Sequence, residues 1–141
     1  MAHDDPDRQA LIRQLVLHEG LRLRPYMDSV GKITIGVGRN LSDNGLTTEE
    51  VLFLLDHDIN EAVADLASFP WFVDLDPIRQ RVLADMRFNL GPTRLRTFKR
   101  MLRALSERNY SWAATAMRES LWYRQVKRRG ERLVRMMRTG I

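Results

Sequence analysis

The sequence predicts an α+β fold that is mostly helical, in which a small N-terminal lobe and a C-terminal helical lobe are joined by one long helix. Alternation of apolar residues with small or polar ones, the pattern of a strand, is confined to residues 33–38. A Thr47-x-x-Glu50 capping box opens the connecting helix, expected over about residues 47–69. From residue 77 onward, apolar residues recur at helical spacing. The small lobe should therefore hold a β-hairpin or a three-stranded sheet.

The small lobe is expected at about residues 18–46. A helix over about residues 6–19 precedes it, because a proline is favoured in a first helical turn and a glycine just past a last one. Residues 29–32 predict a turn between two extended pieces, and residues 41–45 predict a loop. We expect the N-terminal helix to belong with the helical lobe at about residues 70–141, so that the chain forms a single domain.

The helical lobe should contain several short helices. Pro70 stops the connecting helix, and Gly91 with Pro92 interrupts the helical pattern once more. Apolar spacing predicts helices over about residues 77–90, 95–105, 110–119 and 126–137. No internal repeat and no low-complexity linker divides the chain further.

The composition excludes several classes of site. The chain has 141 residues, of which 44% are hydrophobic, enough for a core without disulfides. It contains no cysteine, which removes thiolate chemistry, and its three histidines show no metal-binding spacing. We therefore expect neither a metal nor another cofactor. No apolar run is long enough to cross a membrane, and the polar, acidic start does not resemble a secretory signal.

The net charge of +5 is concentrated near the C-terminus. Most of the excess Lys and Arg residues fall within residues 94–138. A basic face of this kind attracts polyanions, of which nucleic acid and an anionic cell wall are two candidates. A solvated helix face with no partner is the ordinary alternative.

Three residues near the N-terminus have the types and spacing suited to hydrolysis of an acetal. Glu19 is expected at the C-terminal end of a helix, whose partial negative charge favours the protonated carboxyl that a general acid requires. Asp28 follows at the edge of a hairpin, where an ionised carboxylate could hold a water. Thr34 follows on the strand and could hold the same water. Two carboxylates in different environments are the equipment of a glycosidase.

Each of these residues also has an ordinary structural interpretation. Glu19 could be a surface residue at a helix end, and Thr34 a good strand former. Asp28 could simply cap backbone N–H groups in a turn. The catalytic interpretation is favoured only when the three residues are considered together.

The combination resembles a known family. The segments that carry the resemblance are His18–Arg22, Tyr26-x-Asp28, Gly31-x-x-Thr34-Ile35-Gly36-x-Gly38, Phe88–Gly91 with Phe98, Ser120–Gln125 with Arg129, and Arg138–Gly140. Together they are similar to the phage lysozymes (endolysins) of the T-even type, glycoside hydrolase family 24. The resemblance extends over roughly residues 10–141, nearly the whole chain, and implies a lysozyme-like fold.

The resemblance also implies a reaction, the hydrolysis of the β-1,4 bond between N-acetylmuramic acid and N-acetylglucosamine in peptidoglycan. By the family's pattern Glu19 is the general acid, and Asp28 with Thr34 positions the attacking water, so that the outcome is inversion. Arg129 is expected near Glu19 as a supporting residue. Phe88 should line the sugar-binding cleft, with a core aromatic as its alternative role, and Asn40 should face the cleft and contribute a backbone contact.

The chain departs from the T-even pattern at several positions. Arg39 stands where the T-even member has a histidine that pairs with an acid on the connecting helix, which predicts an ion pair between Arg39 and Asp58. The loop at residues 41–45 is shorter. Met101 and Ala116 replace polar residues that face substrate, so that contacts to distal sugars or to the peptide stem should differ. Trp122 is expected to be a packing anchor rather than a sugar platform.

The expected partner is therefore peptidoglycan, with no nucleic acid, no membrane insertion and a monomeric chain. The expected location is the cytoplasm of the producing cell, with action on the wall after release. Three alternatives stay open. They are a basic helical module that binds nucleic acid, a lysozyme-fold wall binder that no longer cuts, and a lytic transglycosylase, which would need no water-holding Asp28.

Overall fold

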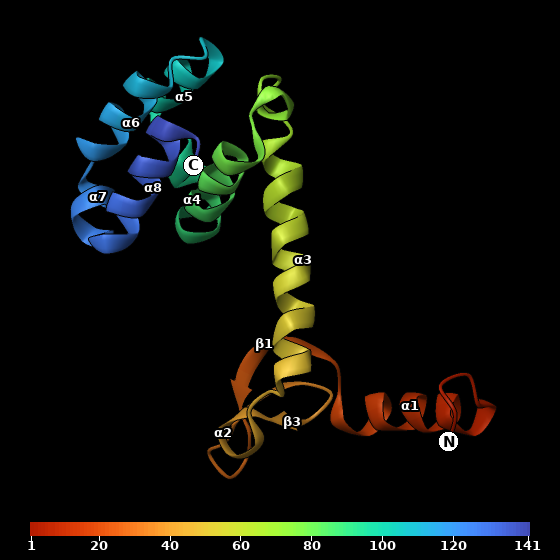
Figure 1. Cartoon of the computed structure of the whole chain (residues 1–141). Coiled ribbons are helices and arrows are strands. Elements are labelled where there is room, and N and C mark those ends of the chain that lie inside the picture. The colour runs from red at the N-terminus through yellow and green to blue at the C-terminus, as the bar shows by residue number, and fades with distance from the viewer. The chain divides into compact units, whose positions relative to one another are not determined.

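A computed structural model describes all 141 residues. It contains eight α-helices, one short 3-10 helix and one three-stranded antiparallel sheet (Figure 1). The predicted α+β, mostly helical fold is confirmed. The chain divides into two compact units, Met1–Leu52 and Phe53–Ile141. The first unit holds the whole sheet, and the second holds most of the helices.

The first unit opens with helix α1, Pro6–Glu19. Its start is set by Asp5, whose side chain accepts a hydrogen bond from the Asp7 amide at 2.9 Å, and by Pro6 in the first turn. Its end is set by Gly20, which adopts a φ of 79° that a residue with a side chain rarely tolerates. The helix therefore stops directly after Glu19.

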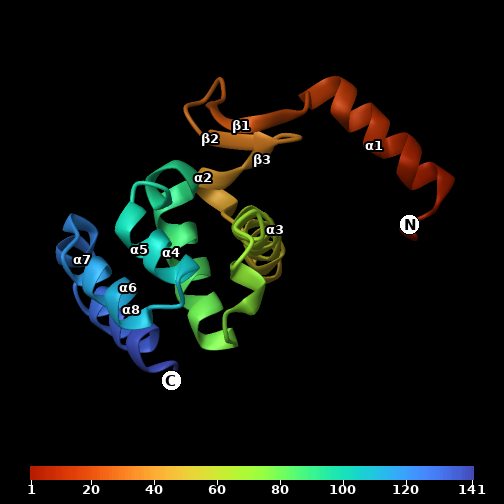
Figure 2. The same cartoon turned by 90° about the horizontal axis from the view of Figure 1, so that it is seen from above.

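The sheet consists of β1 (Arg22–Met27), β2 (Ile33–Gly36) and β3 (Arg39–Asn40), in that order, with β2 in the centre. Figure 2 shows the three strands side by side. Tyr26 pairs with Thr34, and Thr34 pairs in turn with Asn40. Because residues directly opposite each other in an antiparallel sheet share a face, these three form one row across the sheet. The pairing of β1 with β2 is irregular between Arg22 and Tyr26.

Residues 41–44, predicted as a loop, form a one-turn helix, α2 (Leu41–Asn44). Asn40 caps it by accepting from the Asp43 amide at 3.0 Å. Ser42 on this turn accepts a hydrogen bond from the Ile33 amide at 2.9 Å, and Lys32 forms an ion pair with Asp43 at 3.0 Å. The turn therefore ties the end of β3 back to the start of β2.

The connecting helix α3 spans Thr48–Leu66 and begins in the first unit. Its capping box is formed as predicted. The Glu50 amide donates to Thr47 Oγ1 at 3.2 Å, and the Thr47 amide donates to Glu50 Oε1 at 3.0 Å. The 3-10 helix η1, Phe72–Asp74, follows it in the second unit.

The second unit contains α4 (Pro77–Leu95), α5 (Lys99–Ser106), α6 (Tyr110–Arg118), α7 (Leu121–Val126) and α8 (Arg128–Thr139). The predicted interruption at Gly91 and Pro92 appears as a kink inside α4, where Gly91 has φ 80° and ψ 171°. Helix α7 was not predicted. Helix α8 packs against α4, α6 and α7, as Figure 1 shows.

The core of the second unit is apolar and well filled. Its largest fully buried side chains are Leu66, Val82, Leu83, Met86, Leu95, Met101, Leu105, Met117 and Met137. Each such side chain contributes about 1.5–3 kcal/mol relative to leaving it exposed. This core forms around α4, α6 and α8 and fixes the helices that line the pockets described below.

One carboxylate joins α3 to the kinked helix α4 before its kink and to the C-terminal cap of α4 after it. Asp65 accepts from Arg87 Nε at 2.6 Å and from Arg96 Nη2 at 2.7 Å. Arg87 precedes Gly91 in the chain and Arg96 follows it, so that Asp65 spans the kink. The pKa of Asp65 lies below its ordinary value because Arg96, and less strongly Arg87, donates hydrogen bonds to it. The kink is therefore fixed by an ionic network in addition to packing.

Candidate active site

Glu19 is the last residue of α1 and lies against the turn between β2 and β3. The evidence is the surroundings of Gly38, where a Cβ atom would lie only 2.9 Å from Glu19 Oε2 and 3.2 Å from its carboxyl carbon. Such a contact is shorter than packed atoms allow. The absence of a side chain at Gly38 thus lets the Glu19 carboxylate approach the sheet.

Asp28 lies at the end of β1 and organises the turn to β2. Its Oδ1 accepts from the amides of Val30 at 3.0 Å and Lys32 at 2.8 Å. Its own amide donates to the Lys32 carbonyl at 2.9 Å. The turn-capping role considered for Asp28 is therefore present, but it occupies one carboxylate oxygen. Within the chain, Oδ2 has no hydrogen-bond partner and is able to accept one from a ligand or a water.

Thr34 lies on the central strand, is 3% exposed, and is the most buried polar residue of the chain. Its hydroxyl donates to the Lys32 carbonyl at 3.1 Å. Asp28 and Thr34 are thus brought together through the peptide groups of Lys32. Because the hydroxyl proton is used by this carbonyl, the lone pairs of Thr34 Oγ1 are left to accept a hydrogen bond.

Asn40 lies directly opposite Thr34 in the register of the sheet. Its side chain is fully engaged, because Oδ1 accepts from the Asp43 amide at 3.0 Å and Nδ2 donates to Asp43 Oδ2 at 2.9 Å. A ligand at this edge would meet the backbone of Asn40 rather than its amide group. The expected backbone contact stays a prediction.

Arg39 pairs with a different acid from the one predicted. We expected Asp58, but the guanidinium binds Glu50, with Nη2 at 2.7 Å from Oε2 and Nη1 at 3.1 Å from Oε1. Arg39 also donates to the carbonyl of Gly45 at 3.3 Å, which holds it beside the start of α3. The pair with Arg39, together with hydrogen bonds to Thr47, lowers the pKa of Glu50 to about 2.

Phe88 and Arg129 belong to the second unit and line one pocket of about 360 Å³ with residues of α3 and α4. Phe88 is 50% exposed, so it is not a core aromatic. Arg129 binds Asp85, with Nη2 at 2.6 Å from Oδ1. The support of Glu19 by Arg129 stays a prediction. Asp85 was missed from the sequence, although it precedes Phe88 by one helical turn and so shares its face of α4.

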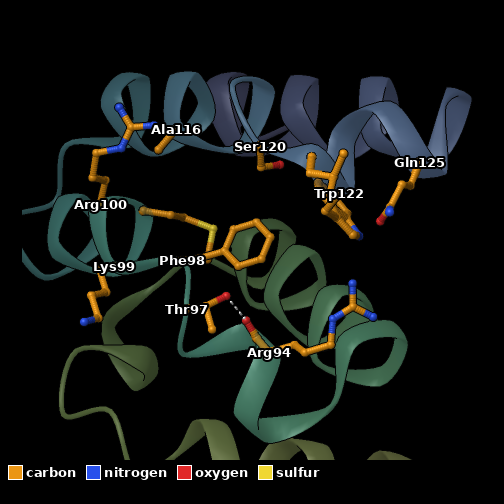
Figure 3. Close-up of a pocket in the computed structure, with 11 residues that line it drawn as sticks. Arg94, Thr97, Phe98, Lys99, Arg100, Ala116, Ser120, Trp122 and Gln125 are labelled. Atoms are coloured by element: carbon orange, nitrogen blue, oxygen red, sulfur yellow. Dashed lines mark hydrogen bonds between the residues drawn. The ribbon is translucent and has the colours of Figure 1, made fainter.

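A second pocket of the helical unit, of about 370 Å³, lies around Phe98. In Figure 3, Arg100 and Ala116 lie at one end of it and Trp122 and Gln125 at the other, with the Phe98 ring between them. Its lining includes three cations and no acid. The cations are Arg94, Lys99 and Arg100. The pocket is therefore suited to an anionic ligand.

Met101 and Ala116, which the resemblance places where the T-even member has polar residues, both line this pocket. Met101 is almost fully buried and contributes to the core. Trp122 is 3% exposed, and its Nε1 donates to Asn89 Oδ1 at 2.9 Å. It packs edge-on against Phe98, with ring centroids 6.0 Å apart. The packing role predicted for Trp122 agrees with this burial.

No three His, Asp or Glu side chains of the chain converge in a way that could hold a metal ion. None of the helices combines the length and apolar character needed to cross a bilayer.

Comparison with known proteins gives relatives of two kinds. The chain is 30% identical to the pre-baseplate central spike protein Gp5 of Enterobacteria phage T4 over an alignment that covers 97% of this chain and 29% of that protein. The chain thus spans less than a third of the length of that relative. It is 28% and 24% identical to probable T4-type lysozymes 1 and 2 of Dictyostelium discoideum, each alignment covering 86% of this chain and 89% of the relative.

The family model described as phage lysozyme matches residues 16–138. The match begins just before Glu19 and includes Asp28, Thr34 and the helical unit up to the end of α8. This chain belongs to the phage lysozyme family.

Proposed function

We propose that the chain is a muramidase that hydrolyses the β-1,4 bond between N-acetylmuramic acid and N-acetylglucosamine in peptidoglycan, with inversion at the anomeric carbon, and so lyses bacterial cell walls. The observation that carries the proposal is that Glu19 lies against the same sheet that presents Asp28 and Thr34. Asp28 lies in the turn between β1 and β2, and Thr34 lies on the central strand β2. Membership of the phage lysozyme family supports the same reaction.

In this proposal Glu19 is the general acid that protonates the leaving glycosidic oxygen. Gly38 leaves room for the carboxyl at the edge of the sheet. General acid catalysis of this kind contributes about 10²–10⁴-fold to a rate.

Asp28 and Thr34 would hold the nucleophilic water. Asp28 Oδ2 and Thr34 Oγ1 both have lone pairs free to accept, since Oδ1 and the Thr34 proton are used within the turn. A water that donates one proton to each acceptor presents its own lone pair outward, toward an anomeric carbon. The ionised Asp28 then takes up the proton as the water attacks. Inversion follows when the two carboxyl groups leave room for that water, roughly 6.5–9.5 Å apart.

The cationic pocket around Phe98 suits the carboxylates of a peptide stem. Neither Arg94 nor Lys99 has an acidic partner in the chain, so both charges are available to a ligand. We propose that the protein acts on peptidoglycan as a monomer, after release from the cell that makes it.

The test is the release of reducing ends from purified peptidoglycan by the wild-type chain and by Glu19→Gln and Asp28→Asn. Both variants should lose about 100-fold or more of the activity, because each removes one of the two proton-transferring groups. Retention of wild-type activity by Glu19→Gln would show that the acid is misassigned. Thermal melting of each variant serves as the folding control.

Analysis of the products distinguishes the remaining alternatives. An inverting hydrolase yields reducing N-acetylmuramic acid with α configuration at first, whereas a lytic transglycosylase yields an anhydro sugar. Binding to the wall without any soluble product would indicate a wall binder that no longer cuts. Either of these two results would contradict the proposed hydrolysis.

A further inference from the structure

A pocket of about 270 Å³ lies between α5 and α6 in the helical unit, and none of the candidate catalytic residues lines it. Its principal lining residues are Arg100, Arg103, Glu107, Trp112, Ala116 and Glu119. Along α6 and its C-terminal cap, Trp112, Ala116 and Glu119 follow one another at helical spacing and so share a face. Arg100, Arg103 and Glu107 do the same along α5 and its C-terminal cap. We name this pocket the α5–α6 groove.

Trp112 is the most unusual residue of the groove. It is 63% exposed, whereas Trp122 in the same unit is 3% exposed. Its backbone is held in place, because it lies in the first turn of α6 and its amide donates to the capping side chain of Asn109 at 3.1 Å. An indole kept in water on a rigid helix presents a flat apolar face with no partner in the chain.

The charges of the groove are balanced. Arg100 pairs with Glu119 at 3.0 Å, and Arg103 pairs with Glu107 at 3.3 Å. Ion-pair donors and acceptors therefore surround the groove without an excess of either sign. The neighbouring pocket around Phe98, in contrast, is lined by cations and no acid.

This combination fits a neutral ring with one apolar face and a rim of hydroxyl groups. A pyranose can place its C–H face on the indole while its hydroxyls bond to guanidinium and carboxylate groups. The small side chains of Ala104 and Ala116 keep the space between the two helices open. An anionic ligand gains nothing from a groove that carries equal numbers of both charges.

The groove is continuous with the cationic pocket. Arg100 and Ala116 line both. Figure 3 shows these two residues together at one end of the pocket around Phe98. A polymer that carries neutral rings and anionic branches could therefore occupy the groove with a ring and the pocket with a branch.

We propose that the α5–α6 groove, which none of the candidate catalytic residues lines, binds a sugar ring of the glycan strand of peptidoglycan, stacked on Trp112. The identity of the glycan rests on the proposed function. The site would retain the enzyme on a strand between cleavage events.

The test uses the Glu19→Gln chain, so that the probe is not consumed, and the tetramer of N-acetylglucosamine, which carries no peptide. Nuclear magnetic resonance reports on the groove itself through the indole N–H of Trp112 and the amides of Thr115 and Ala116. Addition of the tetramer should shift these signals. Trp112→Ala should raise the dissociation constant measured from the two amides about fivefold to tenfold, the loss expected for one stacking contact.

Two further variants complete the design. Trp112→Phe should restore part of the affinity, because it keeps an aromatic face. Val73→Ala changes a residue that is 69% exposed and outside the groove, and it should leave the affinity unchanged. The proposal is overturned if the groove signals do not move, if they move with the same affinity in Trp112→Ala, or if a free stem peptide moves them and the tetramer does not.

The two proposals fail separately. If the native chain hydrolyses peptidoglycan but the groove signals stay fixed, only the groove proposal is wrong. If the groove binds the tetramer but the native chain releases no reducing ends, the proposed hydrolysis is wrong and the sugar site stands.

Discussion

The Glu19 side chain lies against Gly38, and this close approach requires a glycine at position 38. A methyl group on residue 38 would lie only 2.9 Å from Oε2 of the carboxylate at the end of α1. The acid is thus positioned by the backbone of the turn between β2 and β3, and the glycines of the Gly36-x-Gly38 pattern acquire distinct roles. Gly38 makes room for a side chain, whereas Gly36 has nothing within 4 Å of its own missing Cβ.

Gly38→Ala should therefore displace the Glu19 carboxylate and lower kcat about 10–100-fold, the penalty for misplacing a reacting group by about 1 Å. Gly36→Ala is the matched control, because both glycines have a φ of 69° and both substitutions carry the same left-handed strain of about 1–2 kcal/mol. Steady-state rates on peptidoglycan and melting temperatures separate the two effects. Equal loss of kcat in both variants would mean that strain, and not displacement of Glu19, is responsible.

Asp28 allows its structural and chemical roles to be separated by two substitutions. Asp28→Asn keeps an acceptor oxygen for the Val30 and Lys32 amides but removes the charge, so that stability should hold while activity falls at least 100-fold. Asp28→Ala removes both hydrogen bonds and should also destabilise the fold by about 1–2 kcal/mol. Chemical denaturation gives the stability and reducing-end release gives the activity. An asparagine variant that is unstable and fully active would reverse the two roles.

The ion pair between Glu50 and Arg39 should contribute to the stability of the fold in a way that depends on pH. Its pKa is about 2 in the folded chain, below the ordinary 4.5, so the pair with Arg39 contributes fully above about pH 4.5 and is lost as the pH falls through 2. Glu50→Gln should lower the melting temperature at pH 6, and the difference from wild type should shrink between pH 4.5 and pH 2. Salt should reduce the difference, because both side chains are partly exposed. A difference that does not change over this pH range would contradict the assignment.

Substitution of Asp65 should lower the free energy of unfolding more than substitution of an acid in an exposed ion pair, because Asp65 binds two arginines. Asp65→Ala leaves the buried Arg87 without its carboxylate and removes the ionic link between Arg87 and Arg96 across the kink of α4. The expected loss is about 2–4 kcal/mol, toward the lower end for a broken buried pair because Asp65 keeps some exposure. Asp74→Ala removes an exposed partner of Arg108 at 3.8 Å and should change stability by less than about 1 kcal/mol. Urea denaturation of the two variants makes the comparison, and similar losses in both would show that Asp65 does not clamp the kink.

The features predicted well from the sequence are those with local causes. Strand β2 follows from the alternation at residues 33–38, and the start of α3 from the Thr47 capping box. Helices α2 and α7 were missed because four and six residues are too few to show helical periodicity.

In the candidate site too, the sequence predicted the local relationships and missed those that depend on tertiary contacts. Asp28 and Thr34 are close in sequence, and a short turn brings them together, so their spacing was informative. The partners of Arg39 and Arg129 depend on tertiary contacts. Arg129 and Asp85 are 44 residues apart, and no local pattern indicates that they meet. The α5–α6 groove likewise requires two helices to be placed before its lining can be recognised.

The alignment of Asp28 with Thr34 depends on a main-chain unit, since the amide and carbonyl of Lys32 make the contacts. Substitution of the lysine side chain leaves both contacts in place, and its ammonium group serves only the separate pair with Asp43. Position 32 is thus open to a label, a cross-linker or a reversed charge beside the candidate residues Asp28 and Thr34. Proline alone, which lacks the amide hydrogen, would dismantle the arrangement.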